Sequence, residues 1–454
     1  MIDSDLHAAV DRVLPGVRRD LETLVRIPSV SADPARAADV DRSAELVADL
    51  LRGAGLPDVS IKTVAGGKPA VIGRYPAPDG APTVLLYAHH DVQPTGPVEA
   101  WVSPPFEPTE RDGRLFGRGT ADDKAGVALH LAALRAFDGA PPVGVTVFIE
   151  GEEEIGSPTL PAFLDSYHDL LGCDVIVLAD TGNWAVGRPG MSTTLRGLAD
   201  CIVRVATLDH AIHSGGSGPV PDAVTALVRL LATLHDDDGN VAVEGLVSED
   251  ADPLDLDEAR LRQESGLLPG VRLTGTGTLT SRQWTRPSIA VLAIDAPAVD
   301  GVANVLTPVA RAKVSMRVAP GDNAQRALDT LTRHLQSHAP WGAEVTVSQG
   351  TAGEPYRIDS QGPAYDAARA ALREAWGVEA TDIGIGGSIP FVAAFADAYP
   401  RAAILITGVA DPDTRAHGAN ESLHLQELAT GCLAEALLLR NLAAAAPDSP
   451  VRVR

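Results

Sequence analysis

The chain has 454 residues, of which 45% are hydrophobic, and its formal net charge is −23 at pH 7. The length predicts two domains rather than one, and the apolar content excludes a largely disordered chain. The negative charge argues against nucleic acid or an anionic membrane surface as a partner.

The N-terminal residues are acidic, and no apolar segment typical of a signal peptide follows them. No apolar stretch reaches the roughly 18 residues of a transmembrane helix. Three cysteines, Cys173, Cys201 and Cys432, lie far apart without a CxxC spacing. This spacing excludes a disulfide framework and a thiolate zinc finger, and it fits a reducing compartment. We therefore expect a soluble cytoplasmic protein.

The first predicted element is an amphipathic helix over residues 3–26, with a break near Pro15. A second helix is predicted over 41–52 and ends at Gly53. Short strands and helices then alternate to about Asp180. This alternation is typical of α/β layering around a mostly parallel sheet.

The pattern changes near residue 190, where a small α+β module begins. Its predicted helices are 223–235 and 324–337, and its predicted strands include 289–294, 312–318 and 344–348. The earlier pattern returns with helices at 363–376 and 389–398 and a last helix from about 425. We expect an α/β catalytic domain, with a mostly parallel sheet flanked by helices, formed by residues 1–190 and 354–454. Residues 191–353 would be an inserted α+β domain.

Four apolar, strand-like runs each lead to a residue that can bind a metal. The runs are 83–88 before His89, 145–149 before Glu150–Glu154, 175–179 before Asp180, and 402–407 before the loop that contains His417. Open parallel sheets bind ligands beyond the carboxyl ends of their strands. The four runs therefore predict one cluster of His, Asp and Glu at one rim, where metal-dependent hydrolysis can be built.

The segment His89-His90-Asp91 places its first and third side chains on the same side of an extended chain. Asp91 can then accept a hydrogen bond from the far nitrogen of His89, which would fix the tautomer of a metal-binding imidazole. His90 has two interpretations, an additional ligand or a neighbour that faces away from the site.

The acidic motifs also have two interpretations each. Asp122, in Gly117–Lys124, is either part of an acidic helix N-cap or a ligand shared by two metals. The run Glu150–Glu154 is either a solvated face or a pair of glutamates that act on a metal and on its bound water. Asp180 and His417 are weak candidates for metal ligands as single residues, and their predicted place at the same rim is the main support for that role.

Together these motifs resemble the zinc-dependent metallopeptidase family of aminoacylase, carboxypeptidase G, succinyl-diaminopimelate desuccinylase and carnosinase. The resemblance runs from Leu21–Ser31 to His417–Glu421 and consists of the ordered set HxDVxP, GRGxxDDK, EGxEExGS, a lone Asp and HxxNE. The HxDVQP form, the Gly386–Pro390 segment and the size of the inserted domain are most similar to the dipeptidase branch.

The resemblance implies two Zn²⁺ per subunit, with Mn²⁺ or Co²⁺ as alternatives. The implied ligands are His89 and Asp180 at one ion, Glu154 and His417 at the other, and Asp122 between the two. Glu153 would be the general base, and Asp91 would orient His89. The Asp122–Asp123 peptide bond is expected to be cis.

The inserted domain would be the lid and dimerisation domain of the family. His213 matches a lid histidine that reaches across a homodimer toward the developing oxyanion. Asn304 and Arg317 resemble lid residues that contact the substrate, and Arg317 suits a C-terminal carboxylate. Gly387 and Ser388, which lead into a helix, either offer backbone N–H groups for a carboxylate or form a plain strand-to-helix turn.

The implied activity is metal-dependent hydrolysis of an amide bond in a dipeptide or short peptide. An N-acyl-amino-acid amidohydrolase (aminoacylase or deacylase) with the same site is the alternative. A remote alternative is an inert metal-binding scaffold, although the ligand positions and Glu153 are all filled. Many dipeptidase relatives carry Arg-Glu where this chain has Gly384-Ile385, so the resemblance leaves the substrate preference open.

Overall fold

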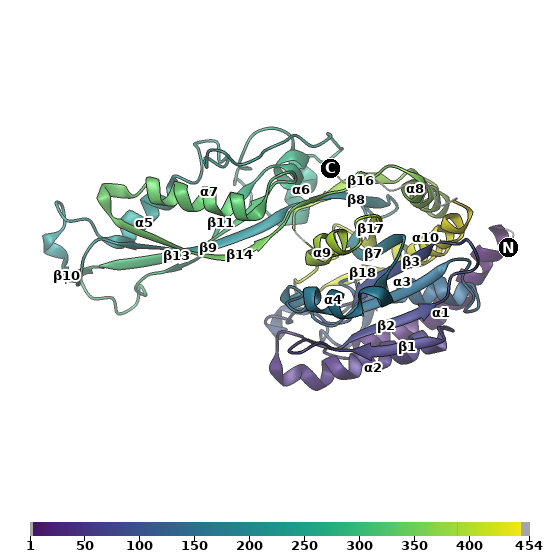
Figure 1. Cartoon of the computed structure of the whole chain (residues 1–454). Coiled ribbons are helices and arrows are strands. Elements are labelled where there is room, and N and C mark those ends of the chain that lie inside the picture. Colours follow the sequence, from purple (N-terminus) through teal and green to yellow (C-terminus); the bar gives the residue numbers. More distant parts are fainter. Residues whose placement is uncertain (1–2, 388, 446–454) are drawn as a thin grey trace. The chain divides into compact units, whose positions relative to one another are not determined.

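The computed structural model describes residues 3–387 and 389–445 (Figure 1). The chain divides into two compact units. Unit 1 comprises Met1–Thr193, Ile358–Ile383 and Pro390–Arg454, and unit 2 comprises Thr194–Arg357 and Gly384–Ile389.

Unit 1 is built on a six-stranded sheet with the strand order β1-β2-β6-β3-β7-β17. In chain order the strands are β1 (Asp58–Lys62), β2 (Ala70–Tyr75), β3 (Thr83–His89), β6 (Gly144–Glu150), β7 (Val175–Gly182) and β17 (Ala403–Ala410). The last four are parallel to one another, whereas β1 and β2 form an antiparallel edge. Every residue of β6 is buried, as expected for a parallel strand covered on both faces. The predicted fold class is confirmed.

Helices flank this sheet. They are α1 (Asp3–Val25), α2 (Ala37–Gly53), α3 (Lys124–Ala136), α4 (Leu160–Leu171), α8 (Pro363–Trp376), α9 (Pro390–Ala398) and α10 (Leu425–Ala444). Helix α3 contacts β3 and β7 and is buried on nearly all sides. Its sequence is apolar around the whole helix, which is the pattern of a core helix rather than a surface one.

Helix α1 continues through Pro15, so the expected break was wrong. Proline removes one backbone hydrogen bond of the helix. Leu6 and Val10 before Pro15, and Val17 and Leu21 after it, are each at most 1% exposed. Burial of one continuous apolar face therefore holds the helix together across the proline.

A small antiparallel sheet in unit 1 connects distant parts of the sequence. Its strands are β4 (Thr109–Arg111), β5 (Arg114–Phe116) and β18 (Ser422–His424), in the order β18-β5-β4. Leu423 pairs with Leu115. The loop that follows β5 and the loop that precedes β18 are therefore neighbours, and both carry candidate metal ligands.

Unit 2 contains a four-stranded antiparallel sheet in the order β11-β13-β9-β14. Its strands are β9 (Gly197–Ala206), β11 (Ser288–Asp295), β13 (Val309–Val318) and β14 (Glu344–Gly353). Helices α5 (Ala223–Ala232) and α7 (Ala324–Ser337) pack with β9 and β13 around one apolar core. Burial alternates along β9, so one face of this sheet is covered and the other is more open.

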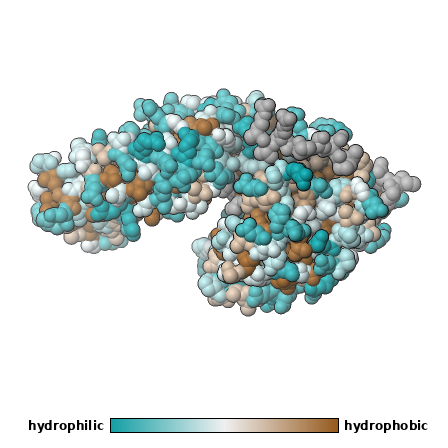
Figure 2. All heavy atoms as spheres, in the orientation of Figure 1, coloured by the Kyte–Doolittle hydropathy of each residue, from teal (hydrophilic) through white to brown (hydrophobic). Residues whose placement is uncertain are grey.

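Short elements complete the described chain. They are β8 (Gly190–Leu195), β10 (Ile212–His213), α6 (Glu258–Ser265), β12 (Val305–Leu306), β15 (Tyr356–Arg357) and β16 (Thr381–Ile385). On the face shown in Figure 2, hydrophilic residues predominate and hydrophobic ones form small groups. Among the described helices, none combines the length and the apolarity that crossing a bilayer requires.

Candidate metal centre

Strand β3 ends at His89, whose side chain is fully buried together with that of Asp91. Nδ1 of His89 lies 3.0 Å from the backbone oxygen of Asp91 and 3.4 Å from its Oδ1. The same carboxylate accepts the backbone N–H groups of Glu153 and Glu154, at 3.2 and 3.1 Å. Burial alone would raise the pKa of Asp91, but the effects of His89, Ser31 and His90 together outweigh burial and lower that pKa. Asp91 thus connects the imidazole to the acidic turn after β6.

Asp122 turns one carboxylate oxygen toward each of two histidines. Its Oδ1 lies 3.2 Å from Nε2 of His89, and its Oδ2 lies 3.0 Å from Nε2 of His417. Two ligand atoms on one tetrahedral zinc ion are about 3.3 Å apart, because each bond is about 2.0–2.1 Å long. Each of the two spacings fits a shared cation. The Asp122–Asp123 peptide bond is cis.

Glu154 faces His417 on the same side of Asp122. Its Oε2 lies 3.3 Å from Nε2 of His417. The amide of Gln93 donates to this Oε2 at 2.8 Å and to the backbone oxygen of Glu154 at 3.0 Å, while the backbone N–H of Gln93 donates to Oε1 at 3.0 Å. Gln93 was not predicted from the sequence, although its place two residues after Asp91 puts it on the same side of an extended segment.

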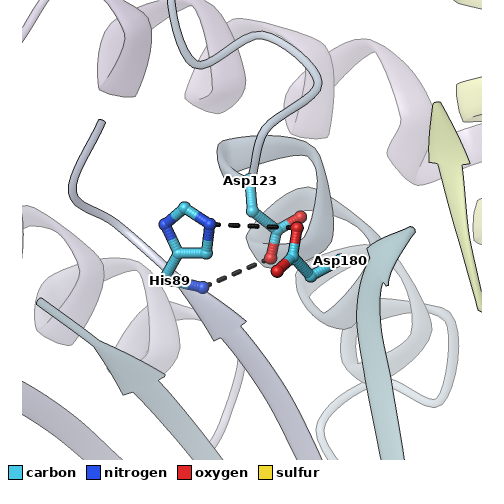
Figure 3. Close-up of side chains that lie close together, drawn as sticks. All are labelled: His89, Asp123 and Asp180. Atoms are coloured by element: carbon cyan, nitrogen blue, oxygen red, sulfur yellow. Dashed lines mark hydrogen bonds and ion pairs between the residues drawn. The ribbon is translucent and has the colours of Figure 1, made fainter. Parts of the chain in front are cut away.

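Asp180, carried by β7, lies close to His89 and Asp123 (Figure 3). Its Oδ1 is 3.8 Å from Nε2 of His89. The carboxylate of Asp123 is also close to His89 and Asp180, and ligand atoms of the three residues all lie within 4.8 Å of one another. Asp123 also caps α3 by accepting the N–H of Gly126, and it accepts the N–H of His89, both at 3.2 Å.

Asp123 was not among the site residues predicted from the sequence. In the structure, burial raises the pKa values of both Asp123 and Asp180 well above their usual range. The charge of Asp122 raises the pKa of Asp123 further, and the charges of Asp123 and Asp122 raise that of Asp180. Two adjacent buried carboxylates need a shared proton or a cation between them. With the nearby imidazoles, this donor set suits zinc, manganese or cobalt.

His90 faces away from this cluster. Its Nε2 lies 2.9 Å from the backbone oxygen of Pro69, and its side chain is fully buried. Burial lowers the pKa of His90 to about 4, so the imidazole is neutral. Of the two interpretations given above, the structure favours a neighbour that faces away.

Glu153 lies in the acidic turn after β6, where its backbone N–H donates to Asp91, and its carboxylate has no hydrogen-bond partner in the part of the chain that the structure describes. Burial raises the pKa of Glu153 to about 7, and the charges of Glu154, Asp91 and Asp122 add to that rise against the opposing effect of His89. A carboxylate with this pKa can accept and return a proton near neutral pH.

The remaining candidate residues lie in unit 2. Strand β10 places His213 opposite Val305 of β12, and Asn304 accepts a hydrogen bond from the hydroxyl of Ser214 at 2.6 Å. Nδ1 of His213 accepts the N–H of Gly215 at 2.9 Å, so the proton of the neutral ring is on Nε2. His213 and Asn304 are therefore near neighbours in this unit.

Arg317 lies on β13 near Gly387, since a Cβ atom built on that glycine would be 3.8 Å from Nη1 of Arg317. Within the described residues, the guanidinium of Arg317 has no hydrogen bond or ion pair, and burial lowers its pKa. Arg196, which the sequence analysis did not single out, donates to the backbone oxygen of Gly386 at 3.2 Å. Ser388 lies outside the described residues.

The family model described as Peptidase family M20/M25/M40 matches residues 85–441. The chain belongs to this family and is a metallo-exopeptidase of its dipeptidase branch. The resemblance seen in the sequence is thereby confirmed.

Three relatives illustrate this relationship. Cysteinylglycine-S-conjugate dipeptidase of Corynebacterium striatum is 35% identical over 431 residues, which cover 93% of this chain and 94% of that protein. Human Beta-Ala-His dipeptidase is 28% identical over 441 residues, which cover 91% and 84%. The solved structure of the dipeptidase Dug1p from Saccharomyces cerevisiae is similar in fold, with a TM-score of 0.83, 22% identity, and 98% and 99% coverage.

Proposed function

We propose that this protein hydrolyses dipeptides with two divalent cations, preferably zinc, bound at the rim of the unit 1 sheet. His89 and Asp180 would hold one ion, Glu154 and His417 the other, and Asp122 would bridge them. The orientation of Asp122, with one oxygen toward each histidine, is the observation that carries this proposal. Such a pair of cations supplies acidification of a water molecule and polarisation of the scissile carbonyl.

In this scheme the protein's own groups move the proton. Glu153 accepts the proton of the attacking water and passes it to the nitrogen of the leaving amine. Its carboxylate makes no competing hydrogen bond within the described chain, and burial holds its pKa near 7. Asp91 positions both Glu153 and His89, because it accepts the backbone N–H of Glu153 and contacts the imidazole of His89.

Unit 2 would supply the substrate contacts and the dimer interface. We propose that Nε2–H of His213 donates to the developing oxyanion of the partner subunit's site, and that Arg317 binds the substrate C-terminal carboxylate with help from Asn304, Gly387 and Ser388. Two features support these roles, namely the proton on Nε2 of His213 and the half-buried guanidinium of Arg317, which has no hydrogen bond or ion pair among the described residues. Arginine forms bidentate pairs with carboxylates.

Exposed apolar side chains on unit 2 support a homodimer formed through this unit. Leu292, Val299 and Val302 are 61%, 89% and 56% exposed. Figure 2 shows several hydrophobic groups near the end of unit 2 that carries β10 in Figure 1. Apolar groups on a surface are candidates for burial against a partner.

The three free cysteines support a reducing, cytoplasmic location.

The direct test combines elemental analysis of the purified protein with a substrate panel. The panel contains cysteinylglycine and its S-conjugates, β-alanyl-histidine, other dipeptides and N-acetyl amino acids. We expect two divalent cations per chain and the highest kcat/KM among the dipeptides, with cysteinylglycine conjugates as the first candidates. Hydrolysis confined to the N-acetyl amino acids would replace the dipeptidase proposal with an N-acyl-amino-acid amidohydrolase.

A further inference from the structure

A buried carboxylate lies beneath the loop that carries Asp122. Glu421 is 0% exposed, and its two oxygens are used entirely within this loop. Oε1 accepts the N–H groups of Ala121 and Asp122 at 3.1 and 3.2 Å, and Oε2 accepts the N–H of Gly119 at 3.1 Å and a guanidinium N–H of Arg118 at 2.6 Å. Four donors on one carboxylate fix the backbone path of the loop up to the nitrogen of Asp122.

Arg118, which forms an ion pair with Glu421, holds a second loop. Arg118 is 1% exposed, and its Nη2 donates to the backbone oxygens of Pro94, His417 and Gly418 at 3.2, 2.9 and 3.2 Å. His417 has a φ of 63°, a left-handed conformation that non-glycine residues seldom adopt. The contact with its backbone oxygen helps to hold this conformation, because the guanidinium fork is rigid and offers several donors at once.

From these contacts we infer that Arg118 and Glu421 are a pair of positioning residues that sets the spacing between Asp122 and His417. Glu421 fixes the backbone of Asp122, and Arg118 fixes the backbone of His417, and the two side chains are joined by their own ion pair. The inference rests on the proposed two-metal function, since it assigns the pair to the cation position formed by Asp122, Glu154 and His417.

The contacts make this effect selective for one of the two positions. Arg118 also holds Pro94, the residue after Gln93, and Gln93 binds Glu154. All three ligands of this position therefore depend on the pair. Asp122 is shared with the other position. The further ligands there, His89 and Asp180, are held by Asp91, Asp123 and β7, and neither Arg118 nor Glu421 contacts them among the described residues. A pair that only stabilised the fold would affect both positions alike.

The test is Arg118→Lys, titrated as metal-free protein with Zn²⁺ against a competing chelator. Lysine keeps the charge and can reach Glu421. Its ammonium group lacks the planar set of donors with which the guanidinium binds Glu421 and the loop oxygens together. We expect the wild-type chain to bind two ions. In the variant, one step should weaken about 10–100-fold while the other changes less than about threefold, which is the scale on which outer-sphere partners act on metal affinity.

Two backgrounds assign the weakened step. In the Asp180→Asn background, the position of Asp122, Glu154 and His417 should be the tighter one. Adding Arg118→Lys to this background should weaken Zn²⁺ binding at that position. In the His417→Gln background, the position with His89 and Asp180 should be the tighter one. Adding Arg118→Lys to this background should not weaken Zn²⁺ binding at that position. Glu421→Gln provides an independent variant if Arg118→Lys does not fold, because it removes the charge and one acceptor with little change in shape, and it should give the same selective loss.

Arg114→Lys is the matched control. Arg114 is also a largely buried arginine in an ion pair, with Asp411, and it donates to Ser422, the residue next to Glu421. It donates to the backbone oxygen of Ser422 but, among the described residues, not to those of His417 or Gly418, so both binding steps should stay unchanged. Equal weakening of both steps by Arg118→Lys, or no weakening of either, would overturn the inference. A wild-type chain that binds one ion would instead contradict the two-metal function and the inference together.

Discussion

Nε2 of His417 lies 3.0 Å from Oδ2 of Asp122, and the carboxylate of Glu154 approaches the same nitrogen at 3.3 Å. Asp122 first, and then Glu154, raise the pKa of His417 to about 10 in the metal-free protein. The ring is therefore a cation at neutral pH, with a proton on the nitrogen that a metal would need. A metal ligand must be deprotonated, so a cation entering this position displaces that proton.

The first prediction concerns this exchange. Loading the metal-free protein at pH 7 should release a proton from His417, because Nε2 changes from donor to ligand. Isothermal titration in buffers with different ionisation enthalpies measures the number released, and His417→Gln should lower it. Affinity at this position should rise about tenfold per pH unit below the pKa of His417. Loading without proton release would contradict the prediction.

The same pKa shift has a consequence for the stability of the metal-free protein. A histidine whose pKa is raised by folding stabilises the folded state below its unfolded pKa, and this stabilisation is lost as the pH rises through the folded pKa. The contribution of His417 is thus present below about pH 6.5 and disappears as the pH rises through about 10. The side chain is 58% exposed, so solvent screens this contribution.

The second prediction concerns Glu153. Glu153→Gln keeps the shape of the side chain but cannot accept a proton, so kcat should fall by about 10²–10⁴ or more while the metal content stays at the wild-type value. In the wild type, kcat/KM should fall as the pH drops through the pKa of Glu153, since only the carboxylate is a base. That pKa is about 7 without metal, and nearby cations lower it. Unchanged turnover in Glu153→Gln would exclude this base.

The third prediction separates the two adjacent histidines. His90→Gln should retain both metals, because the His90 ring binds Pro69 and faces away from the cluster. His89→Gln should lose metal, since Nε2 of His89 faces Asp122 and Asp180. His90→Ala should lower the free energy of unfolding by up to about 1–3 kcal/mol, because the partly buried backbone oxygen of Pro69 loses this partner. Elemental analysis and urea unfolding measure the two effects, and metal loss in His90→Gln would refute this assignment.

The elements that the sequence predicted best are those with a strong local pattern. The helices expected at 324–337 and 363–376 occur in the structure as α7 and α8. Asn323 caps the first of these helices, and Gly377 ends the second in the left-handed conformation, so local signals marked their bounds. The parallel strands were predictable because burial on both faces leaves continuous apolar runs.

The supporting residues Arg118, Glu421 and Gln93 stand inside the motifs GRGxxDDK, HxxNE and HxDVQP, but no local pattern showed what their side chains contact. Glu421 and Arg118 act on backbone groups about 300 residues away, as in the contact from Asp122 to Glu421. Gln93 is similar, because its role depends on where the turn of Glu154 lies after folding. Such contacts arise from the pairing of β5 with β18 and of β3 with β6, which no spacing in the sequence reveals.

The fourth prediction tests whether His213 acts in the partner subunit's site. Nε2–H of His213 is a donor with no partner among the described residues, and removal of one oxyanion donor costs about 10²–10³ in kcat. His213→Ala should therefore lower kcat by that factor with little change in metal content. His213→Asn, which keeps a donor N–H on a shorter side chain, should recover part of the loss.

Mixing two inactive variants decides which chain supplies the donor. In a heterodimer of His213→Ala with Glu153→Gln, the first chain contributes an intact Glu153, and the second contributes an intact His213. If His213 acts across the dimer, one of the two sites contains both groups, and activity should return to about half the wild-type value per heterodimer. If His213 acts within its own chain, each site lacks one group and the mixture stays inactive. Subunit exchange followed by a turnover assay distinguishes these outcomes, because neither homodimer is active by itself and recovery can come only from the mixed species.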